Sequence, residues 1–391
     1  MSVSSQPGMT DLDHFSYNTN QYNNPQFHTA TETSDLLQDN TPSSNPACTI
    51  KVATFNLFNY LEPPSAFYEF DRIYSQEQWQ KKQGWISRYL AEHQPDVIGF
   101  QEVFSPESLQ QLVHKQGYEH FAVIDEAEII SDYIYQSPVV AIASRYPIAE
   151  LSAVTPDTEL AVAMGLKEDF AFSRQPLRAT IELPYIGRCD CYVVHFKSKR
   201  PMLEQDSADD NSAKSTLIAQ ALKTEISGNW GSAMQRGTEA ALLFTNMIER
   251  RERTGYPMIL MGDFNDSLDG GVLSHLLTRS LRQKSDAESE LLLAKYRLKD
   301  AWDLYRATDY FQATDSFQAE TGRPASYYYY AKGSVLDYIL LSCEFDAEHH
   351  SSLFEVSDYH CYDRHLINPI YERDSESTDH GIVMVKLSLR P

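Results

Sequence analysis

The sequence predicts a mixed α/β fold, in which a few long helices lie outside sheets that include antiparallel hairpins. Two observations lead to this class. Short apolar runs recur along most of the 391-residue chain, and Pro, Gly or polar residues bound them, as is typical of buried strands. The helical patterns between them are too few for strict alternation of strand and helix, so a mixed sheet arrangement is expected.

The first half of the chain supplies six expected strands and two expected helices. Helices are expected at 76–92 and from Pro106 onward. The strands are expected at 49–55, 96–100, 121–124, 137–143, 177–183 and 189–195. The last two strands flank Tyr185-Ile186-Gly187, which predicts an antiparallel hairpin.

The second half begins with a polar, acidic stretch at 202–231, which we expect to be an insertion or mobile loop. A helix follows at about 233–253, because Ala240, Leu243 and Met247 share one face. Further strands are expected near Met258, Val335 and Gly381.

The N-terminal 48 residues differ from the rest in composition. Residues 1–47 are rich in Ser, Thr, Asn, Gln and Asp and contain no Lys or Arg. We therefore expect residues 1–48 to be a disordered polar tail and residues 49–391 to be the folded domain. The chain has no basic start followed by an apolar block and no apolar run of about 18 residues, so a cytoplasmic protein without a membrane span is expected.

Charge and cysteine content exclude some functions. The 55 acidic and 33 basic residues give a formal net charge of −22. Such a chain repels polyanions unless a divalent metal or a local basic patch intervenes, which argues against tight metal-free binding of DNA. Five scattered cysteines favour structural thiols over a disulfide framework or a zinc site. Cys189 and Cys191 should point to the same side of their strand.

Polar side chains stand at the ends of several apolar runs. Asp263 and Asn265 follow the run at 257–262 and project to the same side in extended backbone. A carboxylate beside a carboxamide can hold and deprotonate water, although Asp and Asn also favour plain turns. The other strand-end groups are Asn56, Glu102, His195, Asp379 and His380.

Asp337 lies inside the apolar run 335–340, where a buried carboxylate needs a partner. A histidine such as His380 would suit it. The carboxylate would fix the tautomer of the ring and raise its pKa, which suits the stabilisation of a phosphate.

These segments together resemble the endonuclease/exonuclease/phosphatase superfamily, which has a deoxyribonuclease I-like fold. The motifs occur in the family's order between residues 50 and 388: Thr54-Phe55-Asn56, Gly99-Phe100-Gln101-Glu102-Val103, Ser144-Arg145-Tyr146-Pro147-Ile148, His195, Gly262-Asp263-Phe264-Asn265, Leu336-Asp337-Tyr338-Ile339-Leu340 and Thr378-Asp379-His380. The resemblance implies a four-layer α/β sandwich, in which two mixed, mostly antiparallel sheets pack face to face with helices outside. It also implies that residues 49–391 are a catalytic domain that hydrolyses phosphoester bonds with Mg²⁺ or Mn²⁺.

The resemblance assigns a role to each strand-end group. Asp263 would activate water, Asn265 would orient it, and His380 paired with Asp337 would stabilise the transition state. His195 would contact phosphate or assist the leaving oxygen. The implied metal site comprises Glu102, Asn56 and Asp379.

Arg178 and Lys197 are the candidate phosphate-binding residues, with a structural ion pair and a solvated loop as their respective alternatives. Lys199 and Arg200 extend the patch of Lys197. Some abasic-site nucleases have a further acid two residues after the first-strand Asn, where this chain has Phe58. The tyrosine run 327–330 could stack on bases or sugars, or form a packed strand edge.

The expected substrate is a phosphoester, with nucleic acid first and a phospholipid or inositol phosphate second. A sphingomyelinase-like activity falls in the second group. A third hypothesis, from another class, is a binding scaffold without turnover. No obligate protein partner is evident from the sequence.

Overall fold

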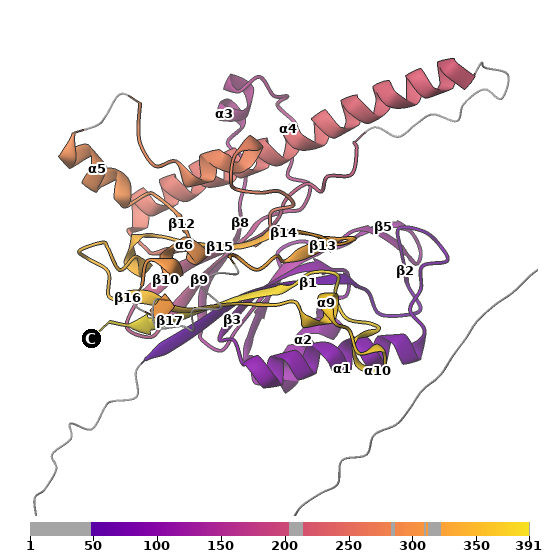
Figure 1. The fold of residues 1–391 in the computed structure, drawn as a ribbon, viewed down its shortest axis with the longest axis horizontal. Helices are drawn as coiled ribbons and strands as arrows, with labels where there is room; N and C mark the ends of the chain where they lie inside the picture. Colours follow the sequence, from indigo (N-terminus) through magenta and orange to yellow (C-terminus); the bar gives the residue numbers. More distant parts are fainter. Residues whose placement is uncertain (1–47, 203–213, 283–285, 309, 312–321, 391) are drawn as a thin grey trace, which may run out of the picture. The chain divides into compact units, whose positions relative to one another are not determined.

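Two six-stranded sheets form the centre of the protein in the computed structural model, which describes residues 48–202, 214–282, 286–308, 310–311 and 322–390 (Figure 1). The first sheet has the order β16 (Phe354–Tyr362), β17 (Ile382–Leu389), β1 (Thr49–Tyr60), β3 (Val97–Val103), β7 (Val139–Ser144), β4 (His120–Ala122). The second has the order β12 (Lys299–Asp300), β15 (Asp337–Leu341), β11 (Met258–Asp263), β10 (Gly187–His195), β9 (Leu177–Leu183), β8 (Ile148–Ala153).

Three apolar cores separate four layers. The central core takes Val52 and Val385 from the first sheet and Val193 and Met261 from the second, so the sheets pack face to face. A second core joins the outer face of the first sheet to helices α1 (Gln76–His93) and α2 (Pro106–Lys115). A third joins the other sheet to α4 (Lys214–Thr254) and the 3₁₀ helix η1 (Gly271–Leu277). The predicted four-layer sandwich is confirmed (Figure 1).

Most neighbouring strands are antiparallel, and β9 and β10 form the predicted hairpin. The thiols of Cys189 and Cys191 lie in the central core, on the same side of β10 as predicted, and both are free. Within the two six-stranded sheets, two pairs of the described strands are parallel, β1 with β3 and β10 with β11. Carboxyl ends of parallel strands meet at one edge of a sheet, so these two pairs decide where the strand-end groups gather.

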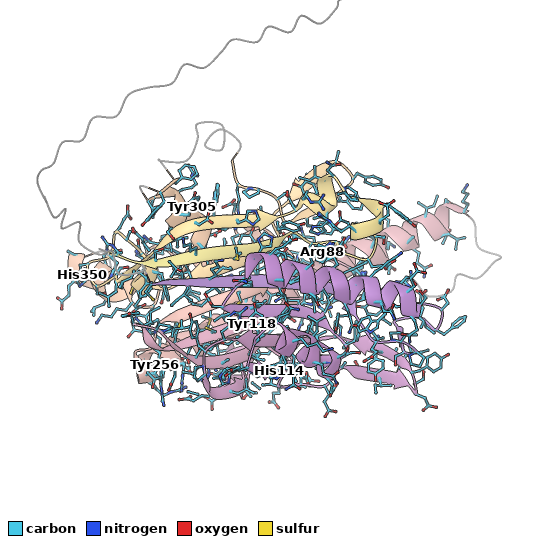
Figure 2. All side chains as sticks on the ribbon, turned by 90° about the horizontal axis from the view of Figure 1, so that it is seen from below. Arg88, His114, Tyr118, Tyr256, Tyr305 and His350 are labelled. Atoms are coloured by element: carbon cyan, nitrogen blue, oxygen red, sulfur yellow. The ribbon has the colours of Figure 1, made fainter. Side chains whose placement is uncertain are left out.

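Local signals in the sequence begin the two helices on the first sheet. Ser75 and Gln78 form a capping box at the start of α1, and Pro106 occupies the first turn of α2. Tyr118, labelled in Figure 2, follows α2 and donates a hydrogen bond of 2.6 Å from its hydroxyl to the carbonyl of Pro95. This contact ties the end of α2 to the start of β3.

The prediction of a loop at 202–231 is wrong for residues 214–231, because α4 begins at Lys214 and runs for 41 residues. Apolar side chains in this stretch recur every four residues, which is a helical spacing, but they lie on the exposed face: Ile218 60%, Leu222 56%, Ile226 61% and Trp230 64% exposed. Ser232 donates to the carbonyl of Arg200 and so fixes the helix to the segment after β10. Residues 203–213, and the expected tail up to residue 47, lie outside the described residues.

The remaining elements are short. Two small sheets pair β13 (Tyr327–Tyr329) with β14 (Lys332–Ser334), and β2 (Ala66–Phe67) with β6 (Ile134–Ser137) and β5 (Glu128–Ser131). The short helices are α3 (Thr158–Ala163), α5 (Ala287–Ala294), α6 (Ala301–Arg306), η2 (Cys343–Phe345), α9 (Arg364–Ile367) and α10 (Tyr371–Asp374). Within the described ranges, every helix is too short or too polar to cross a bilayer.

Candidate active site

The strand ends of both sheets meet at one place. Asn56 opposes Gln101 in the parallel pair β1–β3, and His195 opposes Asp263 in the parallel pair β10–β11. Asp337, at the start of the antiparallel strand β15, also opposes Asp263. The carboxyl ends of β1, β3, β10 and β11 therefore lie near the start of β15. The predicted strand-end groups lie together at this place.

Asp263 is the centre of this group, and its side chain is buried. Its Oδ2 accepts from Nδ2 of Asn56 at 3.2 Å and from Nδ2 of Asn265 at 3.3 Å. Its Oδ1 accepts from the backbone N–H of Asn265 at 2.8 Å. Burial raises the pKa of Asp263 to about 7. The result is an oriented carboxylate that can take a proton near neutral pH.

Glycine at position 262 permits the close approach of the strands that carry His195 and Asp263. Its φ is 154°, and a Cβ built there would lie 2.0 Å from the carbonyl oxygen of Val194. Any other side chain would push β10 and β11 apart.

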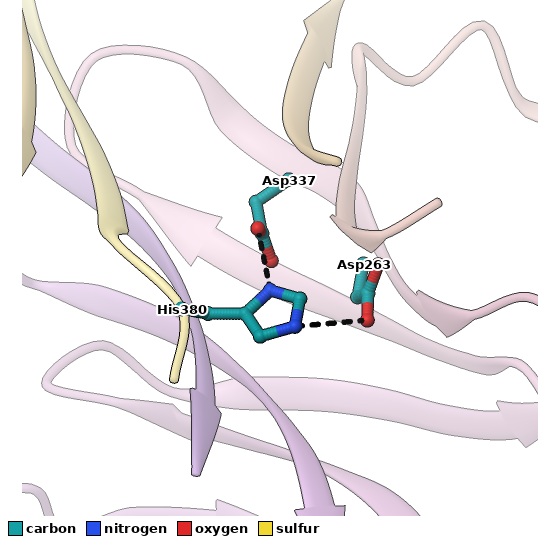
Figure 3. A group of neighbouring side chains, drawn as sticks. All are labelled: Asp263, Asp337 and His380. Carbon is teal, nitrogen blue, oxygen red and sulfur yellow. Dashed lines mark hydrogen bonds and ion pairs between the residues drawn. The ribbon is translucent and has the colours of Figure 1, made fainter. Parts of the chain in front are cut away.

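His380 lies between two carboxylates (Figure 3). Its Nδ1–H donates to Oδ2 of Asp337 at 2.8 Å, and its Nε2 lies 3.9 Å from Oδ2 of Asp263. Burial alone would lower the pKa of His380, but Asp337 and Asp263 together raise it well above its ordinary value. The ring is therefore positively charged at neutral pH and can face a developing negative charge.

His195 differs from His380 in its charge. Its Nε2 lies 3.5 Å from Oδ2 of Asp263, and its Nδ1 is buried without a hydrogen-bond partner among the described residues. Burial lowers the pKa of His195 well below its ordinary value, and Arg174 adds to this effect. A neutral imidazole can donate one proton to a phosphate oxygen or a leaving oxygen.

Two of the predicted metal ligands, Glu102 and Asn56, lie beside each other. The backbone N–H of Asn59 donates to Oε2 of Glu102 at 2.9 Å, and Nδ2 of Asn56 lies 3.5 Å from Oε1. Glu102 has a left-handed backbone with φ 59°, a strained conformation for Glu of the kind that persists at functional sites. Asp379 is partly buried, and its buried Oδ1 has no partner among the described residues.

Mg²⁺ prefers oxygen ligands and commonly takes one or two carboxylates, with water and substrate completing its shell. Glu102 and Asp379 both line the same cavity and supply such oxygens. The Oδ1 of Asn56 already accepts from the backbone N–H of Phe58 at 3.0 Å. The two carboxylates therefore fit a divalent cation, and Asn56 is better placed to hold Glu102 and Asp263.

A second group of possible ligand atoms comprises those of Asp263, Asp337 and His380, all within 4.8 Å of one another. The 2.8 Å hydrogen bond between His380 and Asp337 already links two of them. We therefore interpret these three residues as proton-carrying groups, and Glu102 and Asp379 as the carboxylates that could hold a cation.

A cavity of about 370 Å³ opens over these groups. Its lining includes six predicted site residues: Glu102, His195, Asp263, Asn265, Asp379 and His380. Arg178 and Lys197 are not among the lining residues. The guanidinium of Arg178 lies 3.7 Å from Glu150, and Nζ of Lys197 donates to the carbonyl of Arg200.

The cavity contains other basic and aromatic residues in their place. Lys199 and Arg200 line it, as the extended basic patch suggests, and Tyr327 and Tyr329 come from the tyrosine run. Arg174 and Tyr68 also line it, and neither belongs to a motif that the sequence analysis identifies.

Lys82 is a further residue near the site, and it lies outside the sequence motifs. Its side chain is buried, and Nζ lies 5.6 Å from the ring of Phe58 and 5.4 Å from that of Tyr74. Glu102 and Asp379 are near enough to act on its pKa, but burial dominates and lowers that pKa to about 8. Lys82 lies among Trp79, Trp85 and Ile86 on the apolar face of α1. This spacing in the sequence indicates that its side chain is buried.

Residues around His380 fix its backbone. Thr378 accepts from the N–H of His380 and donates to the carbonyl of Asn56 at 2.6 Å. The ring of His365 donates from Nε2 to the carbonyl of His380 at 2.9 Å. These contacts join the start of β17 to β1.

Comparisons with known proteins agree with the fold. The human Nocturnin catalytic domain with bound sulfate anion has a TM-score of 0.51 and 17% identity, over 88% of this chain and 95% of that chain. ANGEL2, a 2′,3′-cyclic phosphatase, has a TM-score of 0.50 and 12% identity, over 88% and 96%. A search of the curated proteins found no match.

The two-sheet sandwich is that of the deoxyribonuclease I-like class, whose members are phosphoester hydrolases. The family model described as Endonuclease/Exonuclease/phosphatase family matches residues 53–358. The chain belongs to this family.

Proposed function

We propose that residues 49–391 are the catalytic domain of a divalent-metal-dependent phosphodiesterase that uses an activated water. The observation that carries this proposal is the environment of Asp263. Two amide side chains hold its carboxylate, and two imidazoles lie 3.5 and 3.9 Å from it.

In this mechanism Asp263 takes the proton from water, because its raised pKa lets it bind a proton near pH 7. Asn265 donates to the carbonyl of Phe196 at 3.0 Å, which fixes the carboxamide that orients the water. His380, held by Asp337, faces the negative charge that develops on the phosphate. His195 donates to the leaving oxygen.

Glu102 and Asp379 would hold Mg²⁺ or Mn²⁺, which when bound polarises the phosphate and supports the leaving group. Asn56 keeps Glu102 and Asp263 at a fixed separation, because its Nδ2 faces both carboxylates.

A nuclease-type substrate is the first candidate, because the cavity combines basic and tyrosine side chains. A phospholipid or inositol phosphate is the second. One observation favours it: strand β5 carries Ile129 and Ile130, 52% and 56% exposed, in the small sheet that includes β2. An inactive scaffold is disfavoured, because the acidic, amide and imidazole groups of the site lie together around one cavity.

Release of p-nitrophenol from bis-p-nitrophenyl phosphate, with Mg²⁺ or Mn²⁺ and with EDTA, tests the proposal. We expect turnover that EDTA abolishes. If no divalent ion supports EDTA-sensitive turnover, the scaffold hypothesis replaces the enzyme. Plasmid DNA, single-stranded RNA and sphingomyelin, compared at fixed Mg²⁺ and salt, then separate the two substrate classes.

A further inference from the structure

Two arginines line the cavity beside the catalytic groups. Arg174 precedes β9, and Arg200 follows β10. The guanidinium of Arg200 lies 5.8 Å from the centre of the Tyr68 ring, which also lines the cavity. Arg174 donates to the carbonyl of Phe196 at 3.5 Å, immediately after His195. Both arginines therefore belong to the same wall as His195.

Neither arginine has a carboxylate within ion-pair distance in the part of the chain that the structure describes. Two other cationic residues share one carboxylate: Lys199 lies 3.1 Å from Asp266, and Arg236 lies 2.9 Å from it. In a chain with a net charge of −22, two guanidiniums that have no acidic partner among the described residues and lie beside a catalytic cavity are available to an anion. The planar guanidinium fork matches a phosphate in particular.

Aromatic side chains from the β13–β14 hairpin form another part of the lining. Tyr327 pairs with His380 in an isolated bridge, and their rings are 5.2 Å apart. Tyr329 is 67% exposed, and its ring lies 4.8 Å from that of Tyr330. The ring of Tyr327 therefore packs against His380, whereas the ring of Tyr329 has a face that is open to solvent. Such a face binds a planar base by stacking, with little dependence on which base it is.

We propose that Arg174 and Arg200 form a second anion subsite, and that the substrate is a nucleotide with a further phosphate beside the scissile phosphoester. The further phosphate binds the two guanidiniums, and the base stacks on Tyr329. This inference rests on the proposed function and narrows it to a substrate class.

Three substrates with the same leaving group test the subsite: methyl p-nitrophenyl phosphate, thymidine 5′-(p-nitrophenyl phosphate), and the latter with a 3′-phosphate. For the wild-type protein we expect the 3′-phosphate to lower KM by about tenfold or more, as a charge-assisted contact would. In Arg174→Ala and in Arg200→Ala, the ratio of the two KM values should fall below about three. In Tyr329→Ala, the ratio between the methyl and thymidine esters should fall instead.

The matched control is Arg88→Ala, on the exposed face of α1 (Figure 2), which removes the same charge away from the cavity. It should leave the tenfold ratio unchanged. An equal fall in Arg88→Ala, or a wild-type ratio near one, would overturn the subsite. Arg200 is exposed, so its variant remains decisive if Arg174→Ala does not fold.

Calorimetric binding of thymidine 3′,5′-bisphosphate and thymidine 5′-monophosphate distinguishes failure of this inference from failure of the proposed function. Tighter binding of the bisphosphate, lost in Arg200→Ala, supports the subsite even if no ester is hydrolysed. Equal binding of the two ligands refutes it even if methyl p-nitrophenyl phosphate is hydrolysed. Inositol 1,4-bisphosphate binding as tightly as the thymidine bisphosphate would refute the nucleotide assignment.

Discussion

Nδ2 of Asn56 lies 3.2 Å from Oδ2 of Asp263, so a residue of the first sheet donates a hydrogen bond to a residue of the second. The two residues are 207 positions apart in the sequence. The same amide faces Glu102 at 3.5 Å. Asn56 thereby joins the candidate metal ligand of one sheet to the candidate base of the other.

Replacing Asp263 by Asn removes the proton acceptor and keeps the shape of the side chain. We expect kcat for bis-p-nitrophenyl phosphate to fall by roughly 10²- to 10⁴-fold, the usual contribution of a general base. The melting temperature should change little. Asp269→Asn, in the exposed loop that follows, is the matched control. Turnover within threefold of wild type in Asp263→Asn would remove the assigned role.

Replacing Glu102 by Gln removes a negative oxygen from the candidate cation site. The Mg²⁺ concentration for half-maximal activity should rise by about tenfold or more, because Mg²⁺ prefers carboxylate ligands. A Mg²⁺ titration of turnover measures it, with exposed Glu107→Gln in α2 as control. An unaltered Mg²⁺ requirement would reject Glu102 as a ligand.

Lys82→Met should stabilise the protein at pH 7. Burial lowers the pKa of Lys82 from 10.5 to about 8. The folded state therefore disfavours the charged form of Lys82. The contribution of the neutral side chain to the free energy of unfolding is fully present only above pH 10.5 and is lost as pH falls through 8. The difference between the two pKa values lowers the free energy of unfolding by roughly 3 kcal/mol at pH 7. Urea unfolding at pH 7 should show a gain in the free energy of unfolding.

The same substitution should also lower the Mg²⁺ concentration needed for activity, because it removes a positive charge near Glu102 and Asp379. Lys81→Met is the control, since Lys81 lies beside Lys82 on α1 but is exposed and pairs with Glu77. If both variants behave alike, the burial of Lys82 has no special effect.

His365 should make the protein sensitive to mild acid. Burial lowers its pKa from 6.5 to about 4, so the folded state holds the ring neutral while it donates to the carbonyl of His380. The stability that this provides is complete above pH 6.5 and falls progressively between pH 6.5 and 4, by roughly 3 kcal/mol in total.

In His365→Gln, the free energy of unfolding should therefore fall less steeply between pH 6.5 and 4 than in the wild type. The exposed His114 at the end of α2, labelled in Figure 2, gives the control His114→Gln. Parallel pH curves for wild type and His365→Gln would contradict the prediction.

Much of the site could be predicted because its residues stand at the ends of apolar runs. Once those runs are strands, chain topology alone brings Asp263, Asp337 and His195 together. Asp337 was the most informative residue, since a buried carboxylate requires a partner and His380 is that partner.

The basic residues could not be predicted in the same way. Arg174 and Arg178 are four positions apart, and only the point at which β9 begins decides which of them lines the cavity. β9 begins at Leu177, so Arg178 lies within the strand and faces Glu150, while Arg174 remains in the preceding segment. Sequence spacing does not reveal this boundary to the nearest residue.

The first half of α4 was missed for a related reason. Its polar composition resembles a loop, and its apolar side chains mark an exposed face instead of a buried one. The proportion of polar residues indicates whether a segment is buried more directly than whether it is helical. A polar, exposed helix is therefore easily predicted as a loop.

Asn56 bridges the two layers, and neither half of the chain carries the complete candidate site. Residues 48–202 contribute Glu102 and His195, and residues 214–390 contribute Asp263 and His380. The proposed activity therefore requires the assembled sandwich, and we expect a polypeptide cleaved between these halves to show turnover only after both fragments reassociate.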